Sequence, residues 1–257
     1  MKTVLTKMRH KAKERFYMKL QQLLSYTRKA VDDYHMILPD DKIAVGISGG
    51  KDSLAMLYAL THLKRFYPNS FDLTAIMVHL GYPEFKTEQI QALCEELSVP
   101  FHIVETDIAN IIFKERKEHS PCSLCAKMRK GALNVKAKEL GCNKVAYAHH
   151  KDDMIETMLL SLIYEGRFYS FAPVTYLDRM DLTVIRPLMY VPEADVIGFM
   201  NRYHLPVEKN PCPADGNTRR EYVKQLLRQL NLDNPGVKNR MFTAILNGNI
   251  SGWAKRR

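Results

Sequence analysis

The residues best suited to chemistry form one short stretch, Ser48-Gly49-Gly50-Lys51-Asp52-Ser53. An apolar run from Ile43 to Ile47 precedes it and predicts a buried parallel strand, and leucines at helical spacing follow it. Glycines directly after a strand let backbone N–H groups approach an anion, and the start of a helix adds its positive end. Because Ser48 and Ser53 add hydroxyl donors, the stretch predicts a site for the phosphate groups of a nucleotide.

Two other interpretations of this stretch fit less well. A Walker P-loop, Gly-x-x-x-x-Gly-Lys-[Ser/Thr], requires glycine at Val45 and serine or threonine at Asp52. An ordinary Gly-Gly turn does not account for a strand, this motif and a helix arriving in that order.

Polar residues also follow two further predicted strands. His79 lies near the end of the strand predicted over residues 72–80, and His149-His150-Lys151-Asp152-Asp153 follows the strand predicted over 144–148. Ligands of a parallel sheet bind beyond the carboxyl ends of its strands, so we expect these residues to meet the first stretch in one crevice. Asp152 and Asp153 also suit a helix N-cap and first turn. Beside a nucleotide, we favour a shared Mg²⁺ site for the two carboxylates.

The cysteines form a second group of reactive side chains. The chain has five of them, Cys94, Cys122, Cys125, Cys142 and Cys212, an odd number that argues against a disulfide framework. Cys122-Ser-Leu-Cys125 comes directly before a predicted helix, and a C-x-x-C of this kind is a redox pair, half of a zinc site or part of an iron–sulfur site. His119 is available as a fourth zinc ligand with the distant Cys212, whereas Cys94 and Cys142 suit plain burial.

The charge of the chain is concentrated at its two ends. The 257 residues carry a net charge of +10; residues 1–40 have nine Lys/Arg against four Asp/Glu, residues 216–257 nine against two, and the middle twenty against twenty-two. Basic ends on a near-neutral middle suit an enzyme that acts on a polyanion, although they also suit mere solubility. No apolar run is long enough for a membrane span and no signal-peptide pattern opens the chain, so we expect a cytoplasmic protein with reduced thiols.

The elements that must position these residues alternate along the chain. Strands are predicted over 43–47, 72–80, 101–104, 144–148 and 183–185, and helices over 12–36, 86–97, 107–116, 127–140, 149–164, 192–203, 218–230 and 236–247. A further helix is predicted to begin at Asp52-Ser53 and to end before the break at Pro68-Asn69-Ser70. This alternation predicts an α/β fold with a doubly wound, mainly parallel sheet. We expect a core over 41–215 with basic helical extensions over 1–40 and 216–257.

Five sequence features, taken in order, resemble the tRNA 2-thiocytidine synthetases, a family of the PP-loop ATP pyrophosphatases. They are Ser48–Ser53, Pro121–Cys125, Ala148–Thr157, Arg186-Pro-Leu188 and the lone Cys212. The first feature marks only the wider superfamily, and its combination with three cysteines is far more specific. The resemblance extends from about residue 20 to 247.

The resemblance implies ATP- and Mg²⁺-dependent insertion of sulfur at C2 of a cytidine in the tRNA anticodon loop. It implies a [4Fe–4S] cluster on Cys122, Cys125 and Cys212, Mg²⁺ near Asp152 and Asp153, and catalytic roles for Asp52, Asp153 and the three cysteines. The residues expected at ATP are Ser48, Gly49, Gly50, Lys51, Asp52, Ser53, His79, Lys127, Arg129, His149 and Asp152. Further expectations are a tRNA surface on residues 16–31 and 219–257, sulfide or persulfide from a cysteine desulfurase as the sulfur donor, and a homodimer.

Three alternatives remain at the level of the sequence. The first is a PP-loop enzyme that thiolates uridine, and the second is a lysidine-type amine ligase with zinc at the cysteines. The third is a non-catalytic RNA-binding module that retains a nucleotide loop, although the intact Ser48, Asp52 and Ser53 argue against such a loss of function.

Overall fold

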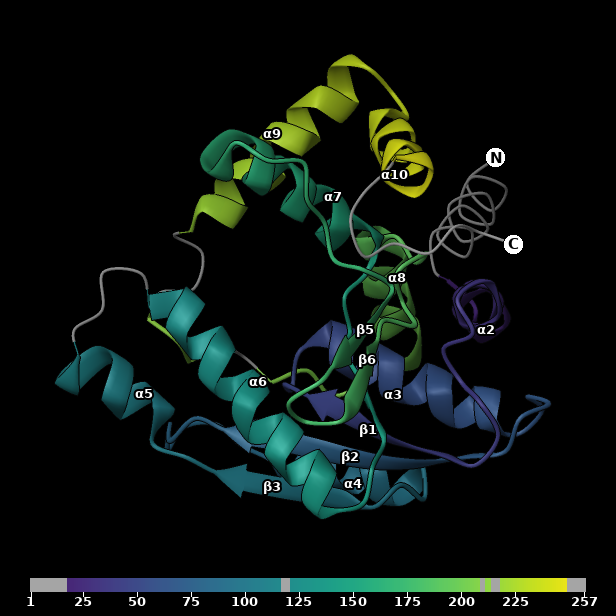
Figure 1. The fold of residues 1–257 in the computed structure, drawn as a ribbon, viewed down its shortest axis with the longest axis vertical. Coiled ribbons are helices and arrows are strands. Elements are labelled where there is room, and N and C mark those ends of the chain that lie inside the picture. The colour runs from purple at the N-terminus through teal and green to yellow at the C-terminus, as the bar shows by residue number, and fades with distance from the viewer. Residues whose placement is uncertain (1–17, 117–120, 209–210, 214–217, 249–257) are drawn as a thin grey trace, which may run out of the picture.

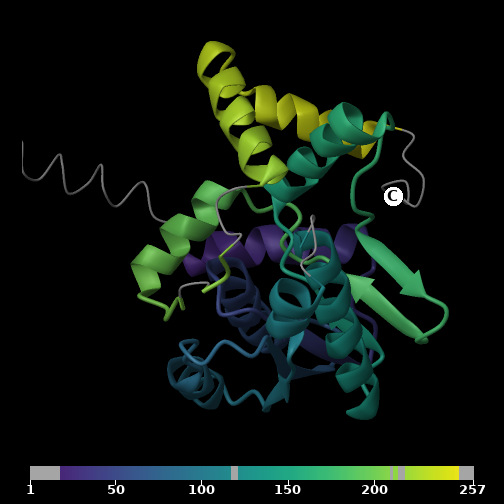
Figure 2. The same cartoon turned by 90° about the vertical axis from the view of Figure 1, so that its left-hand side faces the viewer.

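A six-stranded sheet with the order β3-β2-β1-β4-β6-β5 forms the centre of the computed structural model (Figure 1). The structure describes residues 18–116, 121–208, 211–213 and 218–248. The strands are β1 (Asp41–Ile47), β2 (Phe71–His79), β3 (Phe101–Glu105), β4 (Lys144–Ala146), β5 (Val174–Leu177) and β6 (Leu182–Ile185). All neighbouring pairs are parallel except β5 and β6, which form an antiparallel hairpin at one edge (green arrows in Figure 2).

The strand order places a switch point between β1 and β4. The chain proceeds outward from β1 through β2 to β3 and then returns to the other side of β1, where Val45 lies opposite both Ala75 of β2 and Ala146 of β4. A crevice opens at such a point because the connections after the two central strands lead away in opposite directions. Ser48–Ser53, which we call the phosphate loop, follows β1, and His149–Asp153 follows β4. The two stretches therefore meet at the switch point.

Helices cover both faces of the sheet. They are α2 (Leu20–Asp33), α3 (Lys51–Lys64), α4 (Glu88–Glu96), α5 (Ile108–Asn110), α6 (Pro121–Glu139), α7 (Lys151–Leu160), α8 (Glu193–Tyr203), α9 (Arg219–Asp233) and α10 (Val237–Asn247), with π-helical turns η1 (Ile111–Glu115) and η2 (Ser161–Glu165). No helix among the described residues has both the length and the apolar character needed to cross a membrane.

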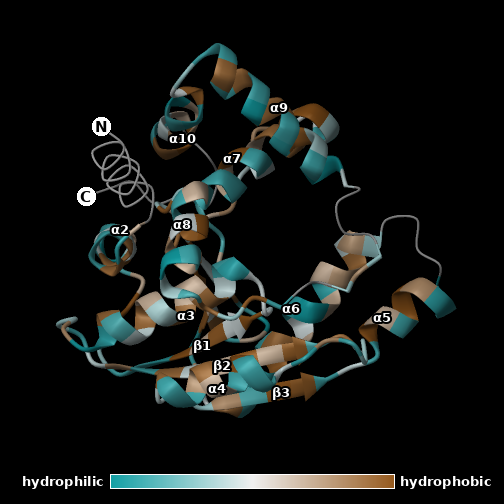
Figure 3. Cartoon of the chain, turned by 180° about the vertical axis from the view of Figure 1, so that it is seen from behind, coloured by the Kyte–Doolittle hydropathy of each residue, from teal (hydrophilic) through white to brown (hydrophobic). Residues whose placement is uncertain are grey.

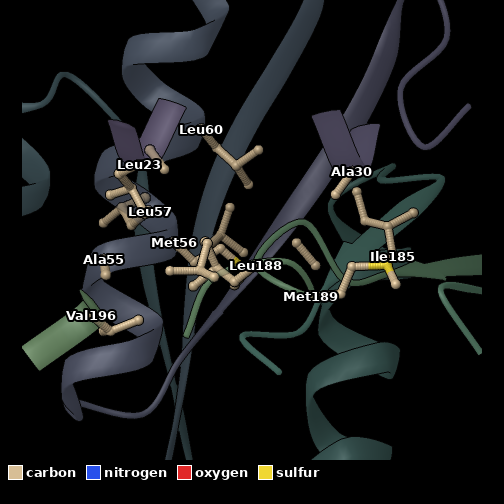
Figure 4. Packing of buried hydrophobic residues seen from close by; sticks show 14 of the residues in the cluster. Leu23, Ala30, Ala55, Met56, Leu57, Leu60, Ile185, Leu188, Met189 and Val196 are labelled. Atoms are coloured by element: carbon tan, nitrogen blue, oxygen red, sulfur yellow. The ribbon is translucent and has the colours of Figure 1, made fainter. Parts of the chain in front are cut away.

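Alternation along the central strands divides the core into two parts. Ile43, Val45 and Met77 pack with α2, α3, α4 and α8 on one face, whereas Ala44 and Ile76 pack with Leu133 of α6 on the other. Figure 3 shows the central strands coloured hydrophobic between these two layers of helices. In the larger part, Leu23 and Ala30 of α2 and Leu57 and Leu60 of α3 pack with the segment Ile185–Met189 (Figure 4). Burial on both faces explains why these strands have continuous apolar runs.

The predicted fold class is confirmed, with several local differences. The helix predicted over 107–116 consists of the short α5 and the π-helical turn η1. The strand β5 was not predicted, and β4 ends at Ala146 instead of Ala148. Helix α6 begins at Pro121, so the C-x-x-C lies inside its first turns instead of before it. The helix predicted over 149–164 ends as the π-helical turn η2. Residues 12–17 of the predicted N-terminal helix lie outside the described residues.

Candidate functional site

The loop after β1 has a backbone that only glycine can adopt at one position. Gly49 has a φ of +79°, and a Cβ there would lie 2.6 Å from Cζ of Phe85. Two serines fix the rest of the loop: the Ser53 hydroxyl donates to the Gly50 carbonyl at 2.9 Å and accepts from the Ser48 N–H at 3.1 Å. The loop is thus preformed at the N-terminus of α3, as an anion site requires.

Lys51 and Asp52 at the start of α3 belong to a charged cluster. The Lys51 ammonium lies 2.9 Å from an Asp52 oxygen and 3.1 Å from Glu193 of α8. Burial by itself lowers the pKa of Lys51, but the two carboxylates outweigh it and raise that pKa above its ordinary value. Glu193 also pairs with Lys224 of α9 at 3.1 Å, so α3, α8 and α9 are joined by charge.

The second polar loop caps helix α7. The His150 N–H donates to Asp153 Oδ2 at 2.9 Å, and the Asp153 N–H donates to His150 Nδ1 at 3.2 Å, which is a reciprocal capping box. Asp152 points elsewhere, because its Oδ2 accepts from the Glu193 N–H and its Oδ1 from Lys238, both at 2.8 Å. Asp152 therefore joins α7 to α8 and α10.

A cavity of about 320 Å³ opens between these two loops. Its polar end contains Ser48, Asp52, Ser53 and Asp153, and its apolar wall includes Leu133. Its volume falls within the range of small-molecule sites, ~300–1,000 Å³. A cavity with an anion-binding loop at its polar end and an otherwise apolar lining suits a nucleotide whose phosphates lie at the loop. We call it the nucleotide cavity.

One wall of this cavity is built around His149. The imidazole stacks on Phe171 with ring centroids 4.2 Å apart, and its Nδ1 accepts a hydrogen bond from Arg186 Nε at 3.1 Å. Burial lowers the pKa of His149 well below its ordinary value, and the nearby cations Arg186, Lys130 and Arg220 lower it further. His149 is consequently neutral and holds the wall in place without adding charge.

Two cations of α6 line the same cavity, and a third does not. Arg129 and Lys130 lie on the lining, and the Lys130 ammonium is 6.0 Å from the Phe171 ring centroid. Lys127 is exposed and lines neither this cavity nor its neighbour. Helical geometry explains the difference, because Ala126, Arg129, Lys130 and Leu133 line the cavity at the i, i+3, i+4, i+7 spacing of one helix face, and Lys127 lies off that face.

A smaller cavity of about 200 Å³ adjoins the first and shares Ser48, Val78 and Arg129 with it. His79, which pairs with Glu105 at 2.9 Å, lies on its lining with Tyr82 and Pro211. The segment that leads to Cys212 is tied to the phosphate loop, since the Glu208 N–H donates to the Gly49 carbonyl at 3.1 Å.

The three predicted cluster ligands meet beside this smaller cavity and form, with Tyr82, what we call the three-cysteine corner. Burial raises the pKa of Cys125, Arg129 opposes the rise, and the proximity of Cys212 and Cys122 adds to it. Burial also raises the pKa of Tyr82 to about 12, aided by a hydrogen bond with Cys212 and by Cys125. Disulfide bonds join none of these three cysteines, whereas Cys94 and Cys142 are buried in the core.

This donor set fits an iron–sulfur cluster. Cysteine thiolates are the usual protein ligands of such clusters, and each binds a different iron, so they need not converge on one point. Among the described residues, no three His, Cys, Asp or Glu side chains are arranged around a single ion. His119, the fourth ligand of a zinc alternative, lies outside the described residues.

Several residues of the site had no predicted role. They are Tyr82, Lys130, Tyr147, Phe171, Arg186 and Glu208. Two of them could have been expected at the site from the sequence, because Tyr147 and Arg186 directly follow β4 and β6. The others reach the site only through tertiary packing.

Comparison with known proteins agrees with this geometry. A family described as a PP-loop domain matches residues 13–231. Proteins named tRNA-cytidine(32) 2-sulfurtransferase from Citrifermentans bemidjiense and Geobacter sulfurreducens are each 39% identical, over 85% and 86% of this chain and 87% of theirs. The chain belongs to this family of PP-loop sulfurtransferases. The family member from Aliivibrio salmonicida is 38% identical over 92% of this chain and 78% of its own.

A solved structure extends the similarity to the whole fold. The U34-tRNA thiolase NcsA from Methanococcus maripaludis, with its [4Fe–4S] cluster, superposes with a TM-score of 0.72. The two chains are 26% identical, and the match covers 92% of this chain and 82% of that one. The structure of that thiolase was solved with the type of cluster that the three-cysteine corner fits.

Proposed function

We propose that the protein is an ATP-dependent tRNA thiolase that converts a cytidine of the anticodon loop to 2-thiocytidine. The observation that carries the proposal is that the two cavities share a wall. The phosphate loop and Arg129 face the nucleotide cavity on one side and the three-cysteine corner on the other. An enzyme that activates a base with ATP and then replaces its oxygen with sulfur needs both sites within reach of one atom.

In the first step, the cytosine O2 attacks the α-phosphorus of ATP. The new O–P bond gives an adenylated base, and the bond to the β-phosphate breaks and releases pyrophosphate. The backbone N–H groups of the loop and the Ser48 hydroxyl hold the departing pyrophosphate. Lys51, Arg129 and Lys130 offset the charge that develops as it leaves.

Magnesium accompanies ATP, and oxygen ligands suit it. We assign this ion to Asp52 and Asp153, because both line the nucleotide cavity, and not to Asp152, which lies off the lining and joins α7 to α8 and α10. Asp52 would exchange its contact with Lys51 for the ion. Gly49, Gly50 and Ser53 shape the loop, and His149 shapes the wall. His79 lies at the smaller cavity, so we place it at the sulfur-transfer side.

The second step replaces the activated oxygen with sulfur, and AMP leaves. Cys122, Cys125 and Cys212 would hold the cluster, which would supply an iron without a protein ligand for the sulfur that is transferred. Arg129 lies between the corner and the nucleotide cavity, so its charge can stay with the phosphate of the leaving AMP.

The partners follow from this chemistry. The tRNA contacts the basic extensions, 1–40 and 216–257, around a core over 41–215, and the surface includes residues 16–31 and 219–257. The sulfur donor is sulfide or persulfide derived from a cysteine desulfurase, the protein acts as a homodimer, and it works in the cytoplasm. Residues 1–17 and 249–257 of the extensions lie outside the described part of the chain.

The test is the product itself. Protein purified without oxygen is incubated with tRNA, Mg-ATP and sulfide, and the nucleosides are analysed by mass spectrometry with Asp52→Ala as the inactive control. We expect 2-thiocytidine and one AMP per product with the wild type, and neither with the variant. Thiolated uridine or an amine adduct, or colourless zinc-containing protein, would replace this proposal with one of the alternatives.

A further inference from the structure

Residues 162–169 hold more exposed large hydrophobic residues than any other stretch of the described chain. All eight residues are exposed, and five of them are large and apolar: Leu162, Ile163, Tyr164, Phe168 and Tyr169, with exposed fractions of 37–47%. The structure describes thirteen exposed large hydrophobic residues, so this one segment holds more than a third of them. Exposed apolar residues gathered in this way mark a binding surface.

Arginines accompany the aromatic rings of this segment. The guanidinium of Arg219, at the start of α9, lies 4.7 Å from the Tyr164 ring centroid, and that of Arg167 lies 4.8 Å from the Tyr169 ring centroid. Glu165 pairs with Arg167 at 2.7 Å, so Arg219 provides the net positive charge. Aromatic rings and guanidinium planes together are the side chains on which unpaired RNA bases stack.

The segment is fixed at both ends. The buried Ser161 hydroxyl accepts from the Tyr169 N–H at 3.1 Å, and the Ser170 hydroxyl donates to the Met154 carbonyl at 2.8 Å. Gly166 makes the turn between these ends with a φ of +64°. A surface held in this way binds with less loss of conformational entropy than a free loop.

The same segment leads directly to the nucleotide cavity. Phe171, two residues after Tyr169, stacks on His149 in the cavity wall. Helices α7 and α9, which carry the segment and Arg219, lie side by side on the far side of the molecule from β3 (Figures 1 and 3). Only Ser170 separates the segment from Phe171, so residues 162–169 lie next to this wall of the cavity.

We propose that residues 162–169 and Arg219 bind the loop of the tRNA substrate by stacking on the unpaired bases next to the target cytidine. This inference rests on the proposed function and adds a surface to the basic extensions. Those extensions attract the phosphate backbone, which carries no information on sequence, whereas this surface contacts bases.

The test uses an anticodon stem-loop RNA with 2-aminopurine next to the target cytidine. Its fluorescence reports stacking and its anisotropy reports affinity. We expect quenching with the wild type, and about a tenfold loss of affinity together with loss of quenching in Phe168→Ala and Tyr169→Ala. Phe168→Leu retains the apolar area and loses the ring, so it should lose most of the quenching as well.

Matched variants separate this role from others. Phe66→Ala removes an exposed ring at the opposite end of α3 from the phosphate loop and should change neither signal. Arg219→Ala should weaken binding and reduce the slope of log K against log salt by about 0.7. ATP binding and sedimentation, measured on every variant, should match the wild type.

Three results would overturn the inference. If the wild type makes 2-thiocytidine but all four surface variants bind and quench the RNA normally, the stacking surface is wrong and the proposed function stands. If Phe168→Leu alone behaves as the wild type, the ring does not stack on a base. If the variants dissociate a dimer without a change in RNA affinity, the surface binds protein. If the wild type binds no stem-loop RNA, the proposed function itself is wrong.

Discussion

The phosphate loop and the three-cysteine corner lie on two sides of Arg129, yet the fold holds them in different ways. The loop lies between a buried strand and a buried helix, and its serines satisfy one another. The corner combines an exposed cysteine, two partly exposed ones and a tyrosine from three separate segments. Packing alone therefore completes the first site, whereas we expect the second to gain its remaining stability from the metal cluster that we assign to it.

Substitution of the three predicted cluster ligands should have the largest effect and should separate the functions of the two sites. We expect Cys122→Ser, Cys125→Ser and Cys212→Ser each to lose iron and to abolish thiolation, because a serine hydroxyl is a poor ligand for these clusters. ATP binding should persist, since none of these residues lines the nucleotide cavity. Iron content, ATP affinity and thiolated product are measured for each variant.

Cys94→Ser and Cys142→Ser are the matched controls. Both residues are buried in the core, so their replacement should cost some stability and leave the iron content unchanged. Full activity in Cys212→Ser would contradict the three-ligand corner and favour a redox role for the C-x-x-C.

Because the loop is preformed, we expect alanine at its two adjacent glycines to lower the free energy of unfolding by very different amounts. Gly49→Ala should lower the free energy of unfolding by about 2–4 kcal/mol, because it combines a positive φ with a clash against Phe85. Gly50→Ala should cost about 1 kcal/mol or less, since its Cβ would lie 3.4 Å from a movable serine hydroxyl. Urea unfolding of the two variants checks this, and equal losses would mean that the loop is not rigid.

The charged cluster behind the loop predicts a dependence on pH. Burial works against ionisation of Glu193, but Lys51, Lys224 and His150 lower its pKa to about 2. Since the folded pKa lies below that of the unfolded chain, the contribution is complete above about pH 4.5 and is lost as the pH falls toward 2. The shift corresponds to about 3 kcal/mol at full strength, and solvent screening of this partly exposed carboxylate reduces the contribution to about 2 kcal/mol.

Glu193→Gln should remove this part of the pH dependence, with the stability measured by urea unfolding between pH 3 and 7. Glu221→Gln on α9 is the control, because Glu221 lies in the first turn of α9 and belongs to none of the ion pairs of this cluster. An unchanged profile in Glu193→Gln would show that the pairs do not stabilise the fold.

The smallest expected effect concerns the basic end of the chain. Removal of residues 248–257 should weaken tRNA binding and reduce the slope of log K against log salt by about 0.7–0.9 for each phosphate that the protein no longer neutralises. The stability of both sites should not change. An unaltered slope would mean that this end does not bind RNA.

The sequence predicts the phosphate loop well because every part of it is local. Strand, glycines and helix start follow one another, and the end of β1 and the start of α3 lie within one residue of the predicted positions. The edge strand β5 was missed because it is short and partly exposed and pairs only with β6, so its pattern is weak.

The remaining details of the site depend on contacts between distant residues. Asp152 and Asp153 are neighbours in the sequence, and only the positions of Glu193 and Lys238 show that the first is engaged between helices. Lys127 and Arg129 could be told apart only after α6 was known to begin at Pro121. The bond between Glu208 and Gly49 joins residues that no local pattern relates.

Through that bond, one peptide group of the phosphate loop is connected to the segment that leads to Cys212. The Gly49 carbonyl, which accepts from Glu208, and the Gly50 N–H, which donates to the Ser48 hydroxyl at 3.3 Å, are the two ends of one amide. A hydrogen bond at the oxygen polarises the amide and makes its N–H a stronger donor, by ~10–30%. The segment that leads to Cys212 therefore strengthens a hydrogen-bond donor of the phosphate loop through a single peptide group.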